Sequence, residues 1–205
     1  ANHVIEVVDP RTVLVEKTKP IKIEFVVRGY LYGSLWENYK QSKTSGLPKG
    51  LQKAERLKSP ISTPTTKADV GHDIELSRED VSTQIGKSTA AEIEEASLRI
   101  YERASQKAEA NGIIIADTKF EFGFHKKELM LIDECLTPDS SRFWPKKTYQ
   151  IGQDQLSYDK QYVRDYLISI GWNRQPPAPK LPEHIVFETS KKYVEAYERL
   201  TGREF

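Results

Sequence analysis

Charged side chains alternate with aromatic ones in the segment Ile113–Phe124 (IIIADTKFEFGF). Successive side chains of a β-strand point to opposite faces, so Asp117, Lys119 and Glu121 share one face and three phenylalanines the other. Asp133 ends the next apolar run. Carboxylates beside an ammonium group suit Mg²⁺ and phosphate better than zinc. The segment therefore predicts a strand that carries a phosphate-handling site, and an ordinary hairpin with solvated charges is the alternative.

The turn after this strand decides whether Glu121 and Asp133 can share a metal ion. Residues that oppose each other directly in a hairpin lie on the same face. A two-residue turn places the two carboxylates on opposite faces, whereas a three-residue turn at residues 125–127 makes all the charges converge. We therefore predict an odd loop or a bulge between residues 122 and 131.

The N-terminal part of the chain predicts three strands and one irregular connection. Residues 3–8, 11–17 and 21–28 are short apolar runs separated by turn signals, and an antiparallel meander is their simplest arrangement. Residues 41–65 are rich in Lys, Ser, Gly and Pro, which predicts a long irregular connection of the kind that often carries function.

Two segments in this part of the chain carry candidate contacts for an anionic substrate. Ser34 and Glu37 have the spacing of a capping box, which predicts a short helix from Ser34. The free N–H groups of a helix N-terminus attract anions, and Arg28 adds positive charge just upstream. Lys67 and Asp73 are further candidate substrate contacts. A normal cap and surface charges are the alternative for both segments.

Helices dominate the remaining sequence. The surest covers residues 88–111, where apolar side chains recur on one face. A second is predicted over residues 158–170, with Arg164 off its apolar stripe. The proline-rich residues 175–182 predict an extended segment. Residues 183–201 predict a short helical turn followed by a last helix.

The composition limits the classes of function. Among 205 residues, 31 Lys and Arg oppose 30 Asp and Glu, so the net charge of +1 gives no reason to expect a nucleic-acid or acidic-membrane partner. No apolar run approaches the ~20 residues that a membrane helix needs. The single cysteine, Cys135, excludes an internal disulfide and suits a reducing compartment, so we expect a cytoplasmic protein.

Five segments together resemble one enzyme family. They are VRGYLYGSLW (27–36), TPTTKADVGHD (63–73), IIIADTKFEFGF (113–124), DECLTPDSSRFWP (133–145) and SYDKQYVRDYL (157–167). In this order they are similar to SAICAR synthetases (phosphoribosylaminoimidazole-succinocarboxamide synthases), and their spelling is closer to the longer, fungal-type members. The resemblance implies an α+β fold, like that of ATP-grasp enzymes and kinases, with an antiparallel sheet and flanking helices. Of its two lobes, residues 1–28 are expected to be the remainder of the ATP-binding β lobe and residues 29–205 the catalytic lobe.

The resemblance implies an ATP-dependent ligase of purine biosynthesis. In that family, ATP activates the carboxylate of carboxyaminoimidazole ribonucleotide (CAIR) as an acyl phosphate, and the amine of L-aspartate then attacks to give SAICAR, ADP and phosphate. ATP and Mg²⁺ are the implied cofactors, and a monomer or homodimer is expected. The family's Gly-rich phosphate loop has no counterpart in this sequence, so we expect a fragment. A nucleotide-binding module without activity, or a ligase or kinase acting on another phosphorylated acid, is the alternative.

The matching family positions divide the site residues into three groups. The catalytic candidates are Lys67, Lys119 and Asp117, of which Asp117 is our choice of general base. The implied substrate contacts are Arg28, Ser34, Asp73, Asp139, Ser141, Arg142 and Arg164. The implied ATP contacts are Lys17, Ile21, Glu24, Glu121 and Asp133, of which Glu121 and Asp133 are expected to hold Mg²⁺.

Overall fold

The computed structural model describes residues 1–44, 46–67 and 74–205, so the candidate Asp73 lies outside the described residues. The chain forms two compact units, each assembled from three separate stretches. Unit 1 consists of Ala1–Arg28, Pro60–Tyr101 and Thr118–Cys135, and unit 2 consists of Gly29–Ser59, Glu102–Asp117 and Leu136–Phe205. The expected division into lobes at residue 28 stays a prediction.

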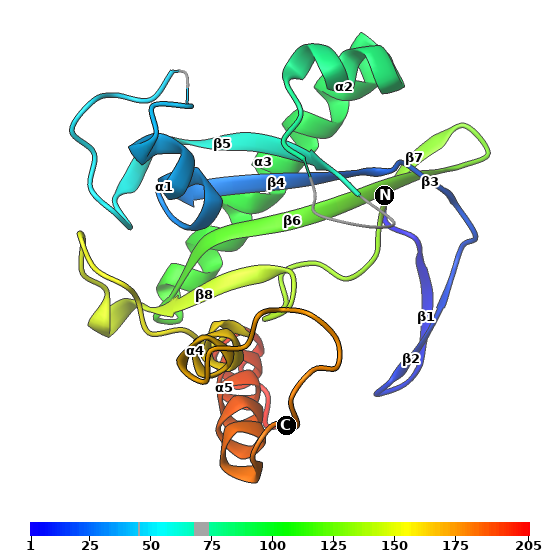
Figure 1. Cartoon of the computed structure of the whole chain (residues 1–205). Coiled ribbons are helices and arrows are strands. Elements are labelled where there is room, and N and C mark those ends of the chain that lie inside the picture. Colours follow the sequence, from blue (N-terminus) through cyan, green and yellow to red (C-terminus); the bar gives the residue numbers. More distant parts are fainter. Residues whose placement is uncertain (45, 68–73) are drawn as a thin grey trace. The chain divides into compact units, whose positions relative to one another are not determined.

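The larger sheet is organised around one long strand. Its strands are β3 (Lys19–Pro20), β4 (Ile23–Tyr30), β5 (Arg56–Thr66), β6 (Ile113–His125), β7 (Glu128–Ile132) and β8 (Ser141–Pro145). The order is β3-β6-β4-β5, and β7 and β8 also pair with β6 (Figure 1). The pairings of β6 with β3 and β7 are antiparallel. With the flanking helices, this confirms the predicted α+β class.

A second, two-stranded sheet consists of β1 (Val4–Asp9) and β2 (Thr12–Val15), which pair antiparallel. The predicted three-stranded meander is therefore wrong, because β4 lies in the larger sheet between β6 and β5. Burial explains the difference. Most side chains of β4 are buried, as expected for a strand inside the larger sheet, whereas every side chain of β1 is exposed, so β1 contributes no face to that core.

The helices are α1 (Gly33–Lys40), α2 (Arg78–Ile85), α3 (Lys87–Ala110), the 3₁₀ turn η1 (Lys146–Thr148), α4 (Gln161–Ser169) and α5 (Glu183–Thr201). The helix predicted over residues 88–111 is confirmed as α3. The expected helical turn and last helix form one continuous helix, α5. No helix in the described part of the chain is long and apolar enough to cross a membrane.

The structure corrects two local predictions and shows one helix that was not predicted. Tyr32, not Ser34, occupies the N-cap of α1, so the predicted capping box is absent and Ser34 lies in the first turn. The true capping box, Ser77 with Asp80, starts α2, which the sequence analysis missed. Part of the predicted irregular connection is the strand β5, which tolerates its prolines because it is the last strand in the sheet order.

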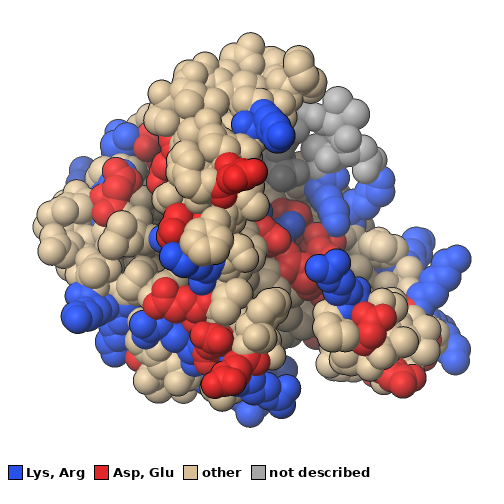
Figure 2. Space-filling view, turned by 90° about the horizontal axis from the view of Figure 1, so that it is seen from below, with Lys and Arg blue, Asp and Glu red and all other residues tan. Residues whose placement is uncertain are grey.

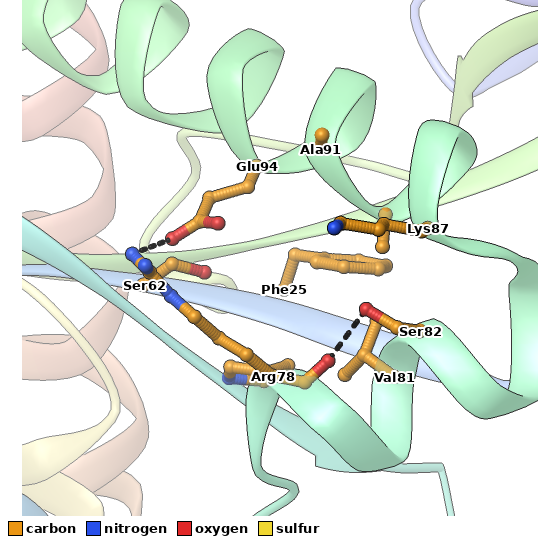
Figure 3. A pocket seen from close by; sticks show the side chains of 10 residues that line it. Phe25, Ser62, Arg78, Val81, Ser82, Lys87, Ala91 and Glu94 are labelled. Atoms are coloured by element: carbon orange, nitrogen blue, oxygen red, sulfur yellow. Dashed lines mark hydrogen bonds and ion pairs between the residues drawn. The ribbon is translucent and has the colours of Figure 1, made fainter.

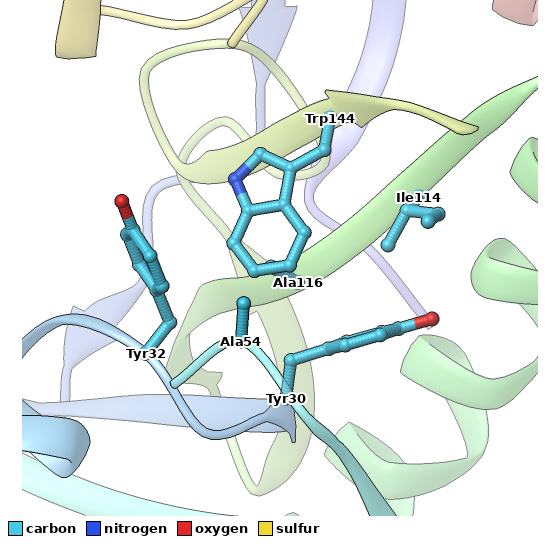
Figure 4. Packing of buried hydrophobic residues seen from close by; sticks show 6 residues of the cluster. All are labelled: Tyr30, Tyr32, Ala54, Ile114, Ala116 and Trp144. Carbon is cyan, nitrogen blue, oxygen red and sulfur yellow. The ribbon is translucent and has the colours of Figure 1, made fainter. Parts of the chain in front are cut away.

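Aromatic side chains form the core of unit 2. Trp144 is 1% exposed and contacts Tyr30 and Tyr32 edge to face, with ring centroids 5.4 and 5.0 Å apart (Figure 4). Ile114 and Ala116 of β6 complete the cluster together with Ala54. Such aromatic pairs are worth about 0.5–1.5 kcal/mol beyond the area that they bury. The cluster therefore fixes β6, β8 and the start of α1, which carry polar side chains that the next section describes.

Candidate functional site

Strand β6 is buried on both faces. Phe120 and Phe122 are 0% and 3% exposed, as the predicted inward face requires. On the other face Asp117 and Glu121 are also buried, at 6% and 4% exposure, and Lys119 is partly buried. Buried charges are costly unless they are paired or bind an ion. The alternative of a hairpin whose charges face solvent is therefore wrong.

The turn after β6 contains two residues, Lys126 and Lys127. The pairing with β7 runs without interruption from His125 opposite Glu128 to Glu121 opposite Ile132. The predicted odd loop or bulge between residues 122 and 131 is therefore wrong. Continued strand geometry would place Asp133 on the face opposite Glu121.

Asp133 nevertheless lies near Glu121, because the chain leaves the strand geometry at this residue. Strand β7 ends at Ile132, and Asp133 has a φ of 60° in the left-handed region. This change in backbone direction brings its carboxylate close enough to raise the pKa of Glu121, although burial of Glu121 is the larger cause. Asp tolerates the left-handed conformation better than most residues. The left-handed backbone of Asp133, rather than the predicted odd loop or bulge, thus brings the two carboxylates together.

Two ammonium groups compensate the carboxylates at this end of unit 1. Lys67 Nζ lies 2.5 Å from Glu121 Oε2, and Lys119 Nζ lies 2.7 Å from Glu24 Oε1 and 3.8 Å from Glu121 Oε1. Burial lowers the pKa of Lys119, but the hydrogen bond and charge of Glu24 outweigh it, so the pKa is raised. With Asp133, three carboxylates face two ammonium groups, which leaves a net charge of −1. We call these five residues the carboxylate–lysine cluster.

The carboxylate–lysine cluster fits a divalent cation. Glu121 Oε1 is buried and accepts no hydrogen bond from the described residues. An orphaned carboxylate oxygen with a second carboxylate nearby is a suitable ligand set for a hard cation that keeps several waters. Among the described residues no group of three or more His, Cys, Asp or Glu side chains is arranged to hold a metal ion by itself.

A second set of polar residues lies in unit 2, around Arg142 of β8. Its Nη1 donates a hydrogen bond to Asp117 Oδ2, and its guanidinium lies 5.7 Å from the ring centroid of Tyr32. The nearby Asp117 charge raises the pKa of Arg142 further above its ordinary value. Tyr32 in turn donates a hydrogen bond of 2.8 Å to Asp154, which also binds Lys53. The guanidinium is thus held in one orientation from two sides.

Gly33 allows the guanidinium of Arg142 to approach the start of α1. A Cβ atom added at Gly33 would lie 2.8 Å from Nη2 of Arg142 and 2.9 Å from Nη1. Gly33 also has a φ of 59°, which glycine adopts without strain. Gly33 at the start of the helix therefore has two effects: it adopts the positive φ, and it leaves room for the guanidinium of Arg142.

Replacing Gly33 with Ala is expected to displace Arg142 and to lower turnover about tenfold or more, because misplacement by about 1 Å can cost 100-fold. Steady-state kinetics of purified protein measure the effect. Gly152 is a matched control, since it also has a positive φ, 85°, but its added Cβ would meet only the flexible end of Gln52. Equal kinetics of the Gly33→Ala and Gly152→Ala variants would contradict the proposed contact.

A cavity of about 620 Å³ opens beside Arg142 in unit 2. Its polar lining residues are Ser34, Glu37, Arg142, Gln161, Arg164 and Arg174. Three of them, Ser34, Arg142 and Arg164, are predicted substrate contacts, and the structure brings these three together. Arg174 was not predicted, because that residue follows the end of α4 and belongs to none of the five resembling segments. We call this space the arginine cavity.

The other predicted substrate contacts are fixed by their own partners. Arg28 is buried in unit 1, and its Nε donates a hydrogen bond of 2.8 Å to Thr63. Asp139 accepts a hydrogen bond from Tyr193 at 2.9 Å, and Ser141 is buried at the start of β8. The convergence of these groups with the arginine cavity and the carboxylate–lysine cluster in one cleft stays a prediction.

The segment that contains the implied ATP contacts Lys17 and Ile21 lies beside the C-terminal part of β6. Ile21 donates its N–H to Phe122 O at 2.8 Å, and Lys17 O lies 3.2 Å from His125 Nδ1. The N–H of Ile21 is therefore used within the protein.

Unit 1 also contains an apolar cavity of about 230 Å³ next to α2 and α3. Phe25 and Val81 contribute to its lining, and the ion pair between Arg78 and Glu94, 2.6 Å long, lies at its edge (Figure 3). Its one acidic side chain is already paired. The lining is mainly apolar and combines no second carboxylate with its basic side chains, so we assign the chemistry to the two polar sites.

One face of the molecule shows no separation of positive from negative side chains. Basic and acidic side chains are interspersed on the face drawn in Figure 2. The net charge of +1 likewise shows that positive and negative side chains nearly balance in number. Proteins that bind nucleic acid through electrostatics instead gather Lys and Arg on one face.

Comparisons with known proteins point to one family. Residues 1–179 match the sequence profile of SAICAR synthetase. The phosphoribosylaminoimidazole-succinocarboxamide synthase of Thermodesulfovibrio yellowstonii is 53% identical over 200 residues, which are 96% of this chain and 68% of that protein. The enzyme of the same name from Desulfosudis oleivorans is 54% identical over 196 residues, 94% of this chain and 67% of that protein.

Solved structures agree with the sequence matches. The SAICAR-synthase from Saccharomyces cerevisiae, complexed with SAICAR, has a TM-score of 0.88 and 38% identity, and the match covers 100% of this chain and 75% of that one. A SAICAR synthetase (Type-2) in complex with ADP has a TM-score of 0.74 and 28% identity, covering 100% of this chain and 73% of that one.

Proposed function

Because the chain belongs to the SAICAR synthetase family, we propose that its two polar sites serve the ATP-dependent joining of L-aspartate to CAIR. This ligase reaction gives SAICAR, ADP and phosphate in purine biosynthesis. The observation that carries the assignment of roles is the buried Oε1 of Glu121, which has no hydrogen-bond partner in the described part of the chain and lies beside a second carboxylate and an ammonium group.

Glu121 and Asp133 are proposed to hold Mg²⁺. These two carboxylates would hold the ion, which would supply positive charge to neutralise phosphate oxygens during phosphoryl transfer. A divalent cation would change the net charge of the carboxylate–lysine cluster from −1 to +1, which favours the approach of a polyphosphate. Nucleotide binding is further supported by the similar SAICAR synthetase (Type-2), whose solved structure is a complex with ADP.

The lysines of the cluster are proposed to stabilise the acyl-phosphate step. Lys119 is held by Glu24, and Lys67 by Glu121, so both ammonium groups are fixed before substrate arrives. Donors that are already oriented stabilise developing negative charge without a cost of reorganisation. Glu24 thereby positions Lys119 in addition to its proposed contact with the ribose of ATP. The connector that contains Lys17 and Ile21 is the proposed adenine contact.

The phosphorylated substrate is proposed to bind in the arginine cavity. Guanidinium groups match phosphate and carboxylate oxygens with two parallel hydrogen bonds, so Arg142 and Arg164 are suitable partners. Ser34 adds a hydroxyl group from the first turn of α1. Asp117 stays our candidate base for the aspartate amine, and its pairing with Arg142 gives it a second role in orienting that guanidinium. Further proposed substrate contacts are Arg28, Asp73, Asp139 and Ser141.

Three coarser features of the protein are also proposed. The likeness to the yeast structure supports the longer, fungal-type form of the enzyme. The single cysteine and the purine pathway support a cytoplasmic location. A monomer or a homodimer is the expected assembly.

A coupled assay of ADP release tests the proposed function. With purified protein, ATP, Mg²⁺ and CAIR, we expect sustained ADP release only when L-aspartate is present, together with formation of SAICAR. Sustained ADP release that is independent of aspartate, with a stable phosphorylated product, would instead indicate a kinase. Nucleotide binding without any ADP release would indicate a binding module.

A further inference from the structure

The arginine cavity contains more positive charge than its neighbours compensate. Arg142 is paired with Asp117, and Glu37 is paired with Lys40 at 2.9 Å. Arg164 and Arg174 also line the cavity, and neither guanidinium has a hydrogen-bond or ion-pair partner among the described residues. Two unmatched positive charges therefore remain among the residues that line the cavity. The two positive charges match the two negative charges of a phosphate monoester. Such a group is mostly a dianion at neutral pH, because its second pKa is near 6.

The backbone around Arg174 forms a tight, hydrogen-bonded turn that fixes the backbone conformation of this residue. Trp172 donates its indole N–H to Gln175 O at 3.0 Å, and Asn173 Oδ1 accepts the N–H of Gln175 at 2.9 Å. Between them Arg174 has a φ of 63°, in the left-handed region. A long side chain rarely adopts this conformation, which costs about 1–2 kcal/mol. Strained residues of this kind gather at ligand sites, where surrounding contacts hold them.

The turn is attached to the helix that carries Arg164. Helix α4 ends at Ser169, and Trp172 donates its backbone N–H to Leu167 O at 3.1 Å. Leu167, Ile168 and Trp172 also line the cavity. The two unpaired guanidiniums are therefore presented from one continuous helix and turn, both at exposed positions that a ligand can reach.

We propose that Arg174 is a substrate-binding residue, which together with Arg164 binds the dianionic phosphate of the ribonucleotide substrate. The inference rests on the proposed function for the identity of the substrate. The chemistry of the two guanidiniums alone fits any phosphate monoester on a small polar molecule. The hydrogen-bonded turn from Trp172 to Gln175 positions the guanidinium.

The test uses the purified protein and two probes, ribose 5-phosphate and ribose, in titration calorimetry. The variant Arg174→Gln is expected to bind ribose 5-phosphate about tenfold more weakly, because it loses a charge-assisted contact. Arg174→Lys should recover part of this loss, and Arg174→Gly, which suits the positive φ, should resemble Arg174→Gln. Arg203→Gln removes the same charge from an exposed position near the C-terminus and should bind like the unaltered protein.

Kinetics provide a second readout. Arg174→Gln should raise KM for CAIR about tenfold and leave KM for ATP and L-aspartate unchanged, with a small effect on kcat. Unaltered affinity for ribose 5-phosphate in Arg174→Gln would overturn the proposal, as would an equal loss in Arg203→Gln. Failure of the unaltered protein to bind ribose 5-phosphate more tightly than ribose would also overturn it. Absence of ligase turnover with intact, Arg174-dependent phosphate binding would overturn the proposed function alone.

Discussion

Replacement of Asp133 by Asn is expected to lower ligase turnover by at least about 100-fold while leaving the fold intact. The carboxylate lies next to Glu121, and the loss of its charge leaves a single carboxylate to hold Mg²⁺. Asn is the right replacement because it tolerates the left-handed backbone that Asp133 adopts, with a φ of 60°. Turnover measured against Mg²⁺ concentration, and thermal unfolding, separate the two effects.

The neighbouring residue provides the control for this variant. Glu134→Gln removes the same charge one position further along, outside the carboxylate–lysine cluster, and is expected to keep normal turnover. Turnover of Asp133→Asn should recover in part at high Mg²⁺, since a weakened site fills by mass action. Normal turnover of Asp133→Asn at every Mg²⁺ concentration would rule out the metal role.

Replacement of Arg142 by Met is expected to destabilise the protein by about 3 kcal/mol and to abolish substrate binding. Its partner Asp117 is 6% exposed, so the substitution leaves a buried carboxylate without its cation. Asp159 also loses a favourable nearby charge, and burial already raises its pKa. Urea denaturation monitored by Trp fluorescence measures the change in the free energy of unfolding.

A double-mutant cycle shows whether the unpaired Asp117 causes this loss. Asp117→Asn combined with Arg142→Met should be more stable than Arg142→Met alone, because no buried charge then remains unpaired. The exposed pair of Arg199 with Glu195 gives the comparison, and Arg199→Met should cost less than about 1 kcal/mol. If Arg142→Met also lowered the free energy of unfolding by less than about 1 kcal/mol, the pair of Arg142 with Asp117 would be effectively solvated.

The hairpin shows where pattern reasoning succeeds and where it fails. Alternation along β6 correctly predicted the buried Phe120 and Phe122 and the shared face of Lys119 and Glu121, because period two is a property of any strand. The turn length was predicted wrongly, from the assumption that Asp133 continues the strand. The left-handed φ of that one residue could not be read from hydrophobic pattern, since Asp is compatible with several backbone regions.

The arginine cavity shows a similar division. Ser34, Arg142 and Arg164 were identified because they lie in segments that resemble one family. Arg174 lies outside those segments, and only its position in the turn after α4 shows that it lines the same cavity. The contact between Gly33 and Arg142 likewise joins residues more than a hundred positions apart.

By itself, the sequence determined the α+β class, the long helix α3, the strand β6 with its alternating faces, and the family to which the chain is similar. These features follow from local periodicity and short motifs, whose physical causes act within a few neighbouring residues. Only the tertiary structure decided that β4 leaves β1 and β2 for the central sheet, and that Glu24 holds Lys119. It also decided that Asp133 turns toward Glu121 and that two arginines of the cavity have no partner in the described chain. Burial and charge pairing cause these outcomes, and both depend on which distant residues come into contact.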